Sequence, residues 1–463
     1  MFVLLFACAN RVVAQTTGGP AQAPVAPVSA EPAEGTHLTW SVSERVRYSG
    51  LRNQFRPGLS GDDQALVFRT TFRADLALPH LVVVGELQDA RAYLTDEQSN
   101  VSTALVNAVD LLQAYVVFGR TTNARAVRPE VQLGRFNMEL GSGRLIAQEA
   151  YRDVTRTFTG AKVRWRPTSS GTLTAFAALP VLTLPDDRDS LLHNRIAPDE
   201  EHFNQKLWGA LYERDRLWLR SRGEIYLYSL REHDDPGKRE TRDRKLWTIG
   251  GRLYRLAAVK VFDFDTEAAW QGGSAHASRG ASDVRSLDVA AHYLHLNGGY
   301  TFAKSWSPRA GLEYDYGSGD SNPADSRWNR FDNLFGNRRV DLAPTSIYGA
   351  LGRENIDTLG VRASIAPTAR IDAFAVYRVV RLAAAADAFA STGVRDPTGR
   401  SETDGGRQVD LRLRAWIIPA SVRVEVGATH LIDGHFLRVA PNATREGNST
   451  FFYADVTYMF GSK

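Results

Sequence analysis

The chain has 463 residues, of which 43% are hydrophobic, 23% charged and 10% aromatic, and its formal net charge at pH 7 is +4. It contains no run of about 18 apolar residues and so no predicted transmembrane helix, and so small a charge gives no reason to expect a nucleic-acid partner. The single cysteine, Cys8, excludes a disulfide within the chain, and because it lies among the first 14 residues, the rest of the chain has no thiolate for a metal site. A β-barrel remains open, because its strands cross a membrane without a long apolar run.

The first residues have the features of an export signal. Met1–Ala14 is apolar and ends in Val-Val-Ala before Gln15, which suits a signal peptidase and predicts a signal peptide over residues 1–14. Cys8 lies inside this segment, and the alternative reading is a lipoprotein attachment site. Residues 15–36 are rich in proline and alanine and are predicted to form a flexible periplasmic leader. The predicted barrel follows, over residues 37–460.

Segments of alternating polarity begin at Leu38 and recur along the rest of the chain. In the first segment, Leu38, Trp40 and Val42 share one face, while Arg45 and Arg47 share the other. Successive side chains of a strand point to opposite faces, so each segment predicts a strand with one apolar and one polar face. The predicted strands are residues 38–48, 66–76, 81–88, 110–118, 131–136, 160–166, 172–179, 206–212, 217–230, 246–254, 261–271, 287–302, 309–316, 358–366, 370–381, 409–416, 422–430 and 450–460.

The connections between these strands alternate in length. Pro79-His80 and Pro367-Thr-Ala369 make tight turns, whereas residues 317–355 form the longest polar interruption. Short periplasmic turns, long external loops and an even strand number are typical of outer-membrane barrels. We therefore predict an all-β protein, a transmembrane antiparallel β-barrel of about 18 strands with short periplasmic turns and long extracellular loops. A soluble β-sandwich or propeller is the alternative, although no repeat period supports a propeller.

Cations recur on the predicted inward faces of the strands. Only seven of the 56 Lys plus Arg are Lys, so 49 are Arg, whose guanidinium binds carboxylates in a bidentate fork. GC-rich coding would also enrich arginine. The candidates for an anion-selective lining are Arg69, Arg73, Lys162, Arg164, Arg166, Arg220, Arg222, Arg412, Arg414 and Arg423. The alternative is that these cations form structural pairs with inward acids such as Asp75, Glu86, Asp265 and Asp372.

Four blocks of short motifs are spread along the predicted barrel. They are Leu133–Phe136 with Leu140–Leu145, Asp153–Phe158, Tyr314–Asp320 with Arg330–Phe335, and Val409–Leu411 with Asp433–Phe436. In these blocks and their order the sequence resembles the alginate-export family of outer-membrane barrels. The resemblance implies an eighteen-stranded porin-type channel and draws attention to Arg135, Arg144 and Asp320 within the motifs. It is a likeness to the broad family, so it does not imply alginate as the substrate.

Metal and catalytic readings find less support in the residues. Asp320, Asn322 and Asp325 offer oxygen ligands for calcium, but the spacing lacks the remaining ligands, so a solvated loop is the prediction. His430 lies on an outward position near Thr450, where a lipase-like barrel enzyme would need a nucleophile, a base and an orienting acid. No orienting acid is evident. We expect no metal, no cofactor and no enzymatic activity.

The functional prediction is a passive channel in the outer membrane of a Gram-negative-type cell. Its cargo would be an anionic (poly)saccharide or a small carboxylate, exported or taken up, and its partners the outer-membrane lipid and periplasmic export-machinery proteins. Residues 138–159 and 317–355 are predicted to fold into the lumen and narrow it. The alternatives are a general nonselective porin and, from another class, the barrel enzyme.

Overall fold

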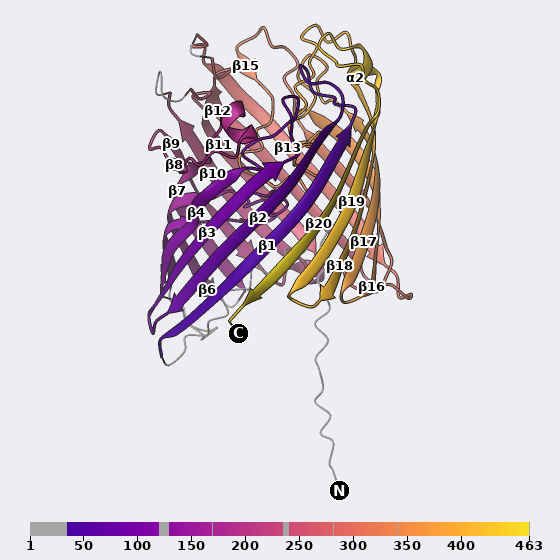
Figure 1. Ribbon diagram of the computed structural model, residues 1–463. Helices are drawn as coiled ribbons and strands as arrows, with labels where there is room; N and C mark the ends of the chain where they lie inside the picture. Colours follow the sequence, from indigo (N-terminus) through magenta and orange to yellow (C-terminus); the bar gives the residue numbers. More distant parts are fainter. Residues whose placement is uncertain are drawn as a thin grey trace.

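The computed structural model describes residues 35–119, 129–168, 170–234, 240–280, 282–339 and 341–462. The predicted signal peptide and nearly all of the predicted leader lie outside these residues. Eighteen antiparallel strands form one continuous wall, and β1 pairs with β20 to close it, with Val46 opposite Val456 (Figure 1). The predicted fold class and strand number are confirmed.

The wall strands follow one another in chain order. They are β1 (His37–Arg52), β2 (Asp63–Ala77), β3 (Leu81–Tyr93), β4 (Asn107–Phe118), β5 (Glu130–Phe136), β6 (Phe158–Thr168), β7 (Gly171–Leu182), β9 (Gln205–Arg214), β10 (Arg222–Glu232), β11 (Lys245–Arg255), β12 (Phe262–Ala275), β13 (Leu287–Thr301), β14 (Arg309–Gly317), β16 (Ile356–Thr368), β17 (Ile371–Arg381), β18 (Asp404–Ile418), β19 (Val422–Asp433) and β20 (Ser449–Gly461). Two two-residue strands, β8 (Glu200–Glu201) and β15 (Arg327–Trp328), pair with β7 and β13.

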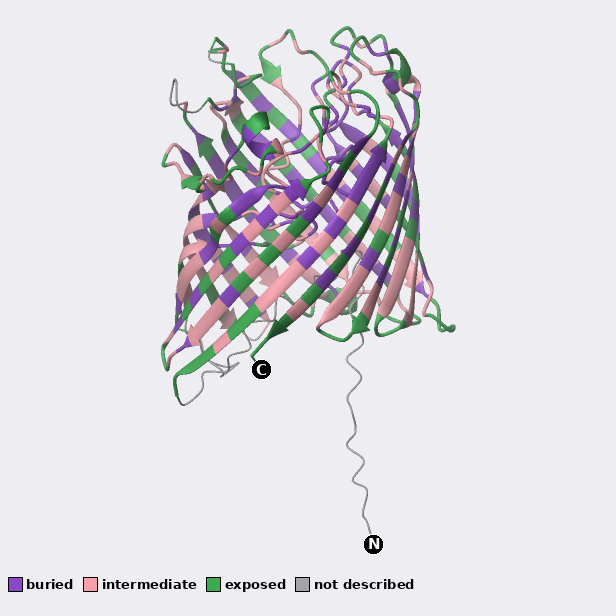
Figure 2. Ribbon diagram, in the orientation of Figure 1, coloured by how far each residue is buried: buried purple, intermediate pink, exposed green. Residues whose placement is uncertain are grey.

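Each wall strand has an apolar outer face and a polar inner face, as its alternation predicts. On β14, Leu312 is 59% exposed on the outside, while Glu313 and Asp315 are buried on the inside. On β1, Leu38 and Trp40 are exposed, while Arg45 and Arg47 are buried. The alternation runs along the strands as stripes of exposed and buried residues (Figure 2). A wall with this pattern fits lipid outside and a polar lumen inside.

The strand connections are short at one end of the barrel and long at the other (Figure 1). Three short ones join β2 to β3, β6 to β7 and β16 to β17, and the chain's C-terminal end lies on the same side. The longest connections join β5 to β6, β7 to β9, β14 to β16 and β17 to β18. The helices are short: α1 (Arg188–Leu192), α2 (His435–Val439) and the 3₁₀ turn η1 (Trp218–Arg220). No helix among the described residues is long and apolar enough to cross a membrane.

One predicted strand begins later than its alternation suggested. Residues 217–221 do not join the wall; Trp218–Arg220 form η1 in the turn between β9 and β10, and β10 starts at Arg222. Leu219 and Arg220 both have positive φ, of 55° and 58°, which a strand does not allow. The prediction that Arg220 lies on an inward strand face is therefore wrong, because the alternating pattern continued through a turn.

Candidate functional site

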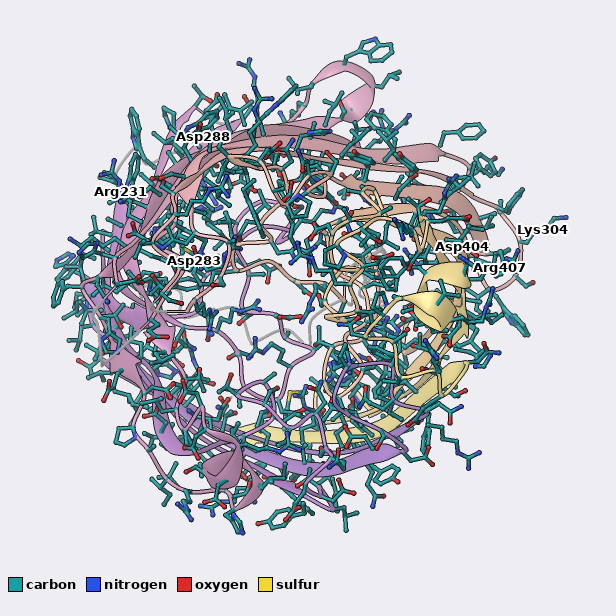
Figure 3. The ribbon with its side chains drawn as sticks, turned by 90° about the horizontal axis from the view of Figure 1, so that it is seen from above. Arg231, Asp283, Asp288, Lys304, Asp404 and Arg407 are labelled. Atoms are coloured by element: carbon teal, nitrogen blue, oxygen red, sulfur yellow. The ribbon has the colours of Figure 1, made fainter. Side chains whose placement is uncertain are left out.

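Two long connections fold into the barrel and meet there. They are residues 137–157, between β5 and β6, and residues 318–355, between β14 and β16. Their backbones pair: the N–H of Phe335 donates to Leu145 O at 2.9 Å, and that of Ala147 donates to Phe335 O at 3.1 Å. A Cβ at Gly336 would lie 1.8 Å from Arg144 O, so only glycine allows this approach. Seen along the barrel axis, loop segments lie inside the ring of strands (Figure 3).

The first lumen loop is tied to the wall by Arg144. Its buried guanidinium donates to Glu267 at 2.8 Å and to Asp265 at 3.0 Å, both on β12, and to Asp341 of the second loop at 2.7 Å. Burial alone would lower the pKa of Arg144, but the contacts with Asp265, Asp341 and Glu267 raise it well above its ordinary value. One buried cation therefore joins both loops and the wall.

The second lumen loop is anchored on two sides of the barrel. Arg353 is fully buried and contacts Asp341 at 2.7 Å and the Tyr293 hydroxyl of β13 at 3.3 Å. Arg339 contacts Asp410 of β18 at 2.6 Å, and the Tyr348 hydroxyl donates to Gln408 at 2.7 Å. The loop is thus fixed to strands on either side of β14 and β16, the two strands that it joins.

The first lumen loop also contacts β1. Arg45 pairs with Asp153 at 2.6 Å, and Arg47 donates to Tyr151 O at 2.6 Å while pairing with Asp455 of β20 at 3.0 Å. These arginines use their charge within the protein. The prediction that both long connections enter the lumen agrees with this placement.

Several of the predicted lining cations are paired. Arg73 contacts Asp75 at 2.7 Å, Glu86 at 3.4 Å and the Tyr115 hydroxyl at 3.1 Å. Arg412 and Arg414 share Asp372. Arg222 lies 2.9 Å from Asp215 near the turn that contains Arg220. For these residues the structural-pair alternative describes the geometry.

The other predicted lining cations have no such partner. Within the described ranges, no carboxylate lies within 4.0 Å of the side-chain nitrogens of Arg69, Lys162, Arg164, Arg166 or Arg423. Arg164 and Arg166 are exposed, and Lys162 Nζ lies 5.2 Å from the centre of the Phe136 ring. For Lys162 and Arg164 the inward direction follows from Phe158, which shares their strand parity and packs against Phe335 of the second lumen loop, and Arg166 follows them at the end of the strand, where the register with β7 shifts. Three unpaired cations therefore line one strand.

The three residues of the family motifs have different surroundings. Arg144 is the buried contact between the two loops described above. Arg135 lies on the outward parity of β5, at the loop end, and pairs with Glu201 at 2.7 Å and, more loosely, with Asp110 at 3.8 Å. Asp320 is buried, and its backbone N–H donates to Asp387 at 3.0 Å. The structure does not bring these three residues together.

The acidic loop residues considered as calcium ligands cap their own turns. Asp320, Asn322 and Asp325 each accept a hydrogen bond from the backbone N–H two residues later, at 3.4, 3.3 and 2.7 Å. A different group has the donor set of a metal site: His295, Asp315 and Asp341 offer ligand atoms within 4.8 Å of one another. Asp341 already contacts the guanidinium groups of Arg144 and Arg353, which compete with a cation for the same oxygens.

Three residues of the second lumen loop were not predicted from the sequence. Arg339, Asp341 and Arg353 make the contacts that hold this loop, yet no periodic pattern surrounds them. The signal that pointed toward them was the concentration of arginine between Arg327 and Arg353 in a segment without strand alternation.

Comparisons with known proteins give a family for the sequence and similar solved structures for the barrel. The sequence matches the family model described as alginate export over residues 37–450. Comparison with curated proteins found no match. The barrel resembles OccK9 (OpdG) of Pseudomonas aeruginosa, with a TM-score of 0.59 and 11% identity over 92% of this chain and 98% of that one. It also resembles OccK2 (OpdF) of the same organism, solved with glucuronate, with a TM-score of 0.54 and 12% identity over 92% of this chain and 97% of that one.

A further similar structure is OpdK of Pseudomonas aeruginosa, solved with vanillate, with a TM-score of 0.56 and 12% identity over 92% of this chain and 99% of that one. A closed eighteen-stranded wall, apolar outside and charged inside, defines an outer-membrane β-barrel of the channel class. Because the family model covers most of the chain, the protein belongs to the alginate export family.

Proposed function

We propose that this barrel passively conducts anions, either anionic (poly)saccharides or small carboxylates, by export or uptake. The observation that carries the proposal is the row of Lys162, Arg164 and Arg166 on the lumen face of β6, without a carboxylate in contact in the described chain. Residues two apart on a strand are separated by about 6.5–7 Å. That spacing is within the Debye length of about 8 Å at physiological salt, so the three potentials overlap.

The chemistry of the row fits carboxylated solutes. Guanidinium and ammonium groups attract carboxylates and repel small cations. Two barrels of similar fold were solved with glucuronate and vanillate, both of which carry a carboxylate. In the export direction, the periplasmic partners would be proteins of an export machinery. A nonselective porin would lack preference for either ion sign.

The proposal includes no catalytic role. His430 Nδ1 lies 2.8 Å from Thr450 Oγ1, so a base and a hydroxyl do meet on the outer face. Within the described residues, no carboxylate lies within 4.0 Å of His430 to orient it as a base. A hydroxyl and an imidazole without that third group are consistent with a cross-strand hydrogen bond of the wall.

Block of the channel current by uronate oligomers tests the substrate class. Replacing Lys162, Arg164 and Arg166 together by Gln should raise the uronate concentration for half-block by about tenfold, a loss of about 1.4 kcal/mol of binding. The matched control replaces Arg216, Arg220 and Lys304 by Gln, which removes the same charge from exposed turn positions. Lys304 points away at the outer edge of the ring (Figure 3). Equal block of the wild type and the lumen variant would contradict the proposal.

A further inference from the structure

A polar cavity of about 260 Å³ lies among the extracellular connections. Five of them contribute to its lining: those between β1 and β2, β3 and β4, β5 and β6, β14 and β16, and β17 and β18. Arg56, Arg152 and Arg338 provide three guanidinium groups, and Thr345 and Ser346 provide hydroxyls. None of these residues is among the cations of the lumen face of β6, so the cavity is a separate site.

The positive charge of this cavity is not balanced by its lining. The lining residues include no Asp or Glu. Within the described residues, neither Arg56 nor Arg338 has a carboxylate within 4.0 Å. The nearest carboxylate to Arg152 is Glu149, at 3.9 Å, and Glu149 is itself closer to Arg156, at 2.9 Å. Glu149, which lies outside the lining, thus faces both Arg152 of the lining and Arg156 outside it, and the three lining arginines keep a net positive charge.

The arginines are held in place by groups that bring no negative charge. Arg56 donates to the carbonyl oxygens of Ile347 and Tyr348 and to the Gln54 amide oxygen. Arg338 donates to Ser391 Oγ at 2.6 Å. Neutral acceptors orient a guanidinium without neutralising it. The geometry therefore holds the cations close together while leaving their charge available.

Polar atoms in the cavity are also left without partners. Thr345 Oγ1, Ser346 Oγ and Arg152 Nε are buried and make no hydrogen bond. A buried polar atom without a partner costs about 1–3 kcal/mol, which is why such atoms in a cavity point to a ligand that accepts hydrogen bonds. Burial and the neighbouring Arg156 lower the pKa of Arg152 to about 9, and burial and Arg338 lower that of Arg56 to about 10. A bound anion would relieve both effects.

The size of the cavity limits the ligand. Its volume lies just below the roughly 300–1,000 Å³ of pockets for drug-sized ligands, and an oligosaccharide does not fit. Three guanidinium groups match more than one carboxylate, because each carboxylate takes a bidentate fork. We propose that this cavity binds a small di- or tricarboxylate at the extracellular side of the barrel. The site deepens the proposed anion transport, on which its biological meaning rests, by naming a solute class.

Equilibrium binding to the full, detergent-solubilised barrel tests this site. By titration calorimetry, tricarballylate should bind at least about tenfold more tightly than acetate, because a second contact adds on the order of 1.4 kcal/mol. Arg152→Gln and Arg338→Gln should each weaken tricarballylate binding by a similar factor. Thr345→Val, which keeps every charge, should weaken it by a smaller factor. Arg400→Gln, an exposed arginine of the β17–β18 connection, is the matched control and should bind like the wild type.

Three outcomes would overturn this assignment. They are equal affinity for tricarballylate and acetate, unchanged affinity in both Arg152→Gln and Arg338→Gln, and tighter binding of inorganic phosphate than of tricarballylate. Heat-modifiable electrophoretic mobility identifies variants that failed to fold, and Thr345→Val tests the site without a charge change. If binding is absent while the β6 variant still alters uronate block, this site is refuted and the channel proposal stands. If tricarballylate binds while the β6 variant leaves uronate block unaltered, the channel proposal is refuted and this binding site stands.

Discussion

Cations in the lumen have two roles that differ in their partners. Arg144, Arg339 and Arg353 contact carboxylates directly and hold the loops to the wall. Lys162, Arg164 and Arg166 have no such carboxylate within the described residues. The paired cations stabilise the structure, whereas the unpaired cations are available to bind solutes. Pairing, and not arginine content, therefore separates scaffold from lining.

Arg144→Gln should release the lumen loops. Removing one partner of a buried charge pair costs about 3–5 kcal/mol, because it leaves the other charges buried and unpaired. Glu267 would lose its cation, Asp265 and Asp341 would keep only Arg252 and Arg353, and the loops would lose the side chain that joins them to β12 while keeping their backbone hydrogen bonds. We expect a larger and noisier single-channel conductance in planar bilayers.

The control for this variant is Arg400→Gln, which removes the same charge from an exposed loop position and should leave the conductance unchanged. A normal conductance in Arg144→Gln would mean that the loops hold their position without this cluster.

At the scale of the strand, the two faces should respond differently to charge. Leu312→Arg places a cation on the outer face of β14, where Leu312 is exposed. Near the bilayer midplane this costs about 2–4 kcal/mol, because nothing there solvates the charge. Arg164→Val on the lumen face of β6 should be tolerated far better. Urea unfolding of the barrel in vesicles measures both, and equal losses would show that the two faces are wrongly assigned.

The connections make a second prediction at this scale. An epitope tag at Pro367-Thr-Ala369, where β16 ends and the turn to β17 begins, should stay hidden on intact cells, because short turns face the periplasm. A tag at Asp186–Asp189, exposed in the β7–β9 connection, should be reached by external antibody. Surface labelling of the Pro367 tag alone would invert the barrel's orientation.

At the scale of the whole molecule, the wall could be predicted from the sequence because it repeats. A period of two residues fixes which side chains share a face, and closure needs only an even number of such strands. The prediction therefore places Leu312 outside and Asp315 inside from local pattern alone. Register between neighbouring strands then follows from the short turns.

The loop contacts could not be predicted in the same way. Arg144 and Asp341 are 197 positions apart, and neither lies in a periodic segment. Whether an inward arginine is paired depends on neighbouring strands: Arg412 pairs with Asp372 of β17, while Arg164 lies opposite Glu130 of β5 and forms no ion pair with it within 4.0 Å. The error at Arg220 has a local cause, since nothing in Leu219 or Arg220 signals a positive φ.

The central claim is that the cations of β6 make the lumen prefer anions, and a reversal potential measures this preference. In a potassium chloride gradient at low salt, the wild-type barrel should show an anion-preferring reversal potential. Changing Lys162, Arg164 and Arg166 together to Gln should move it toward zero, and the difference should shrink as ionic strength rises, because screening weakens the same charges. An unchanged reversal potential at low salt would contradict the account and show that these cations serve only the structure.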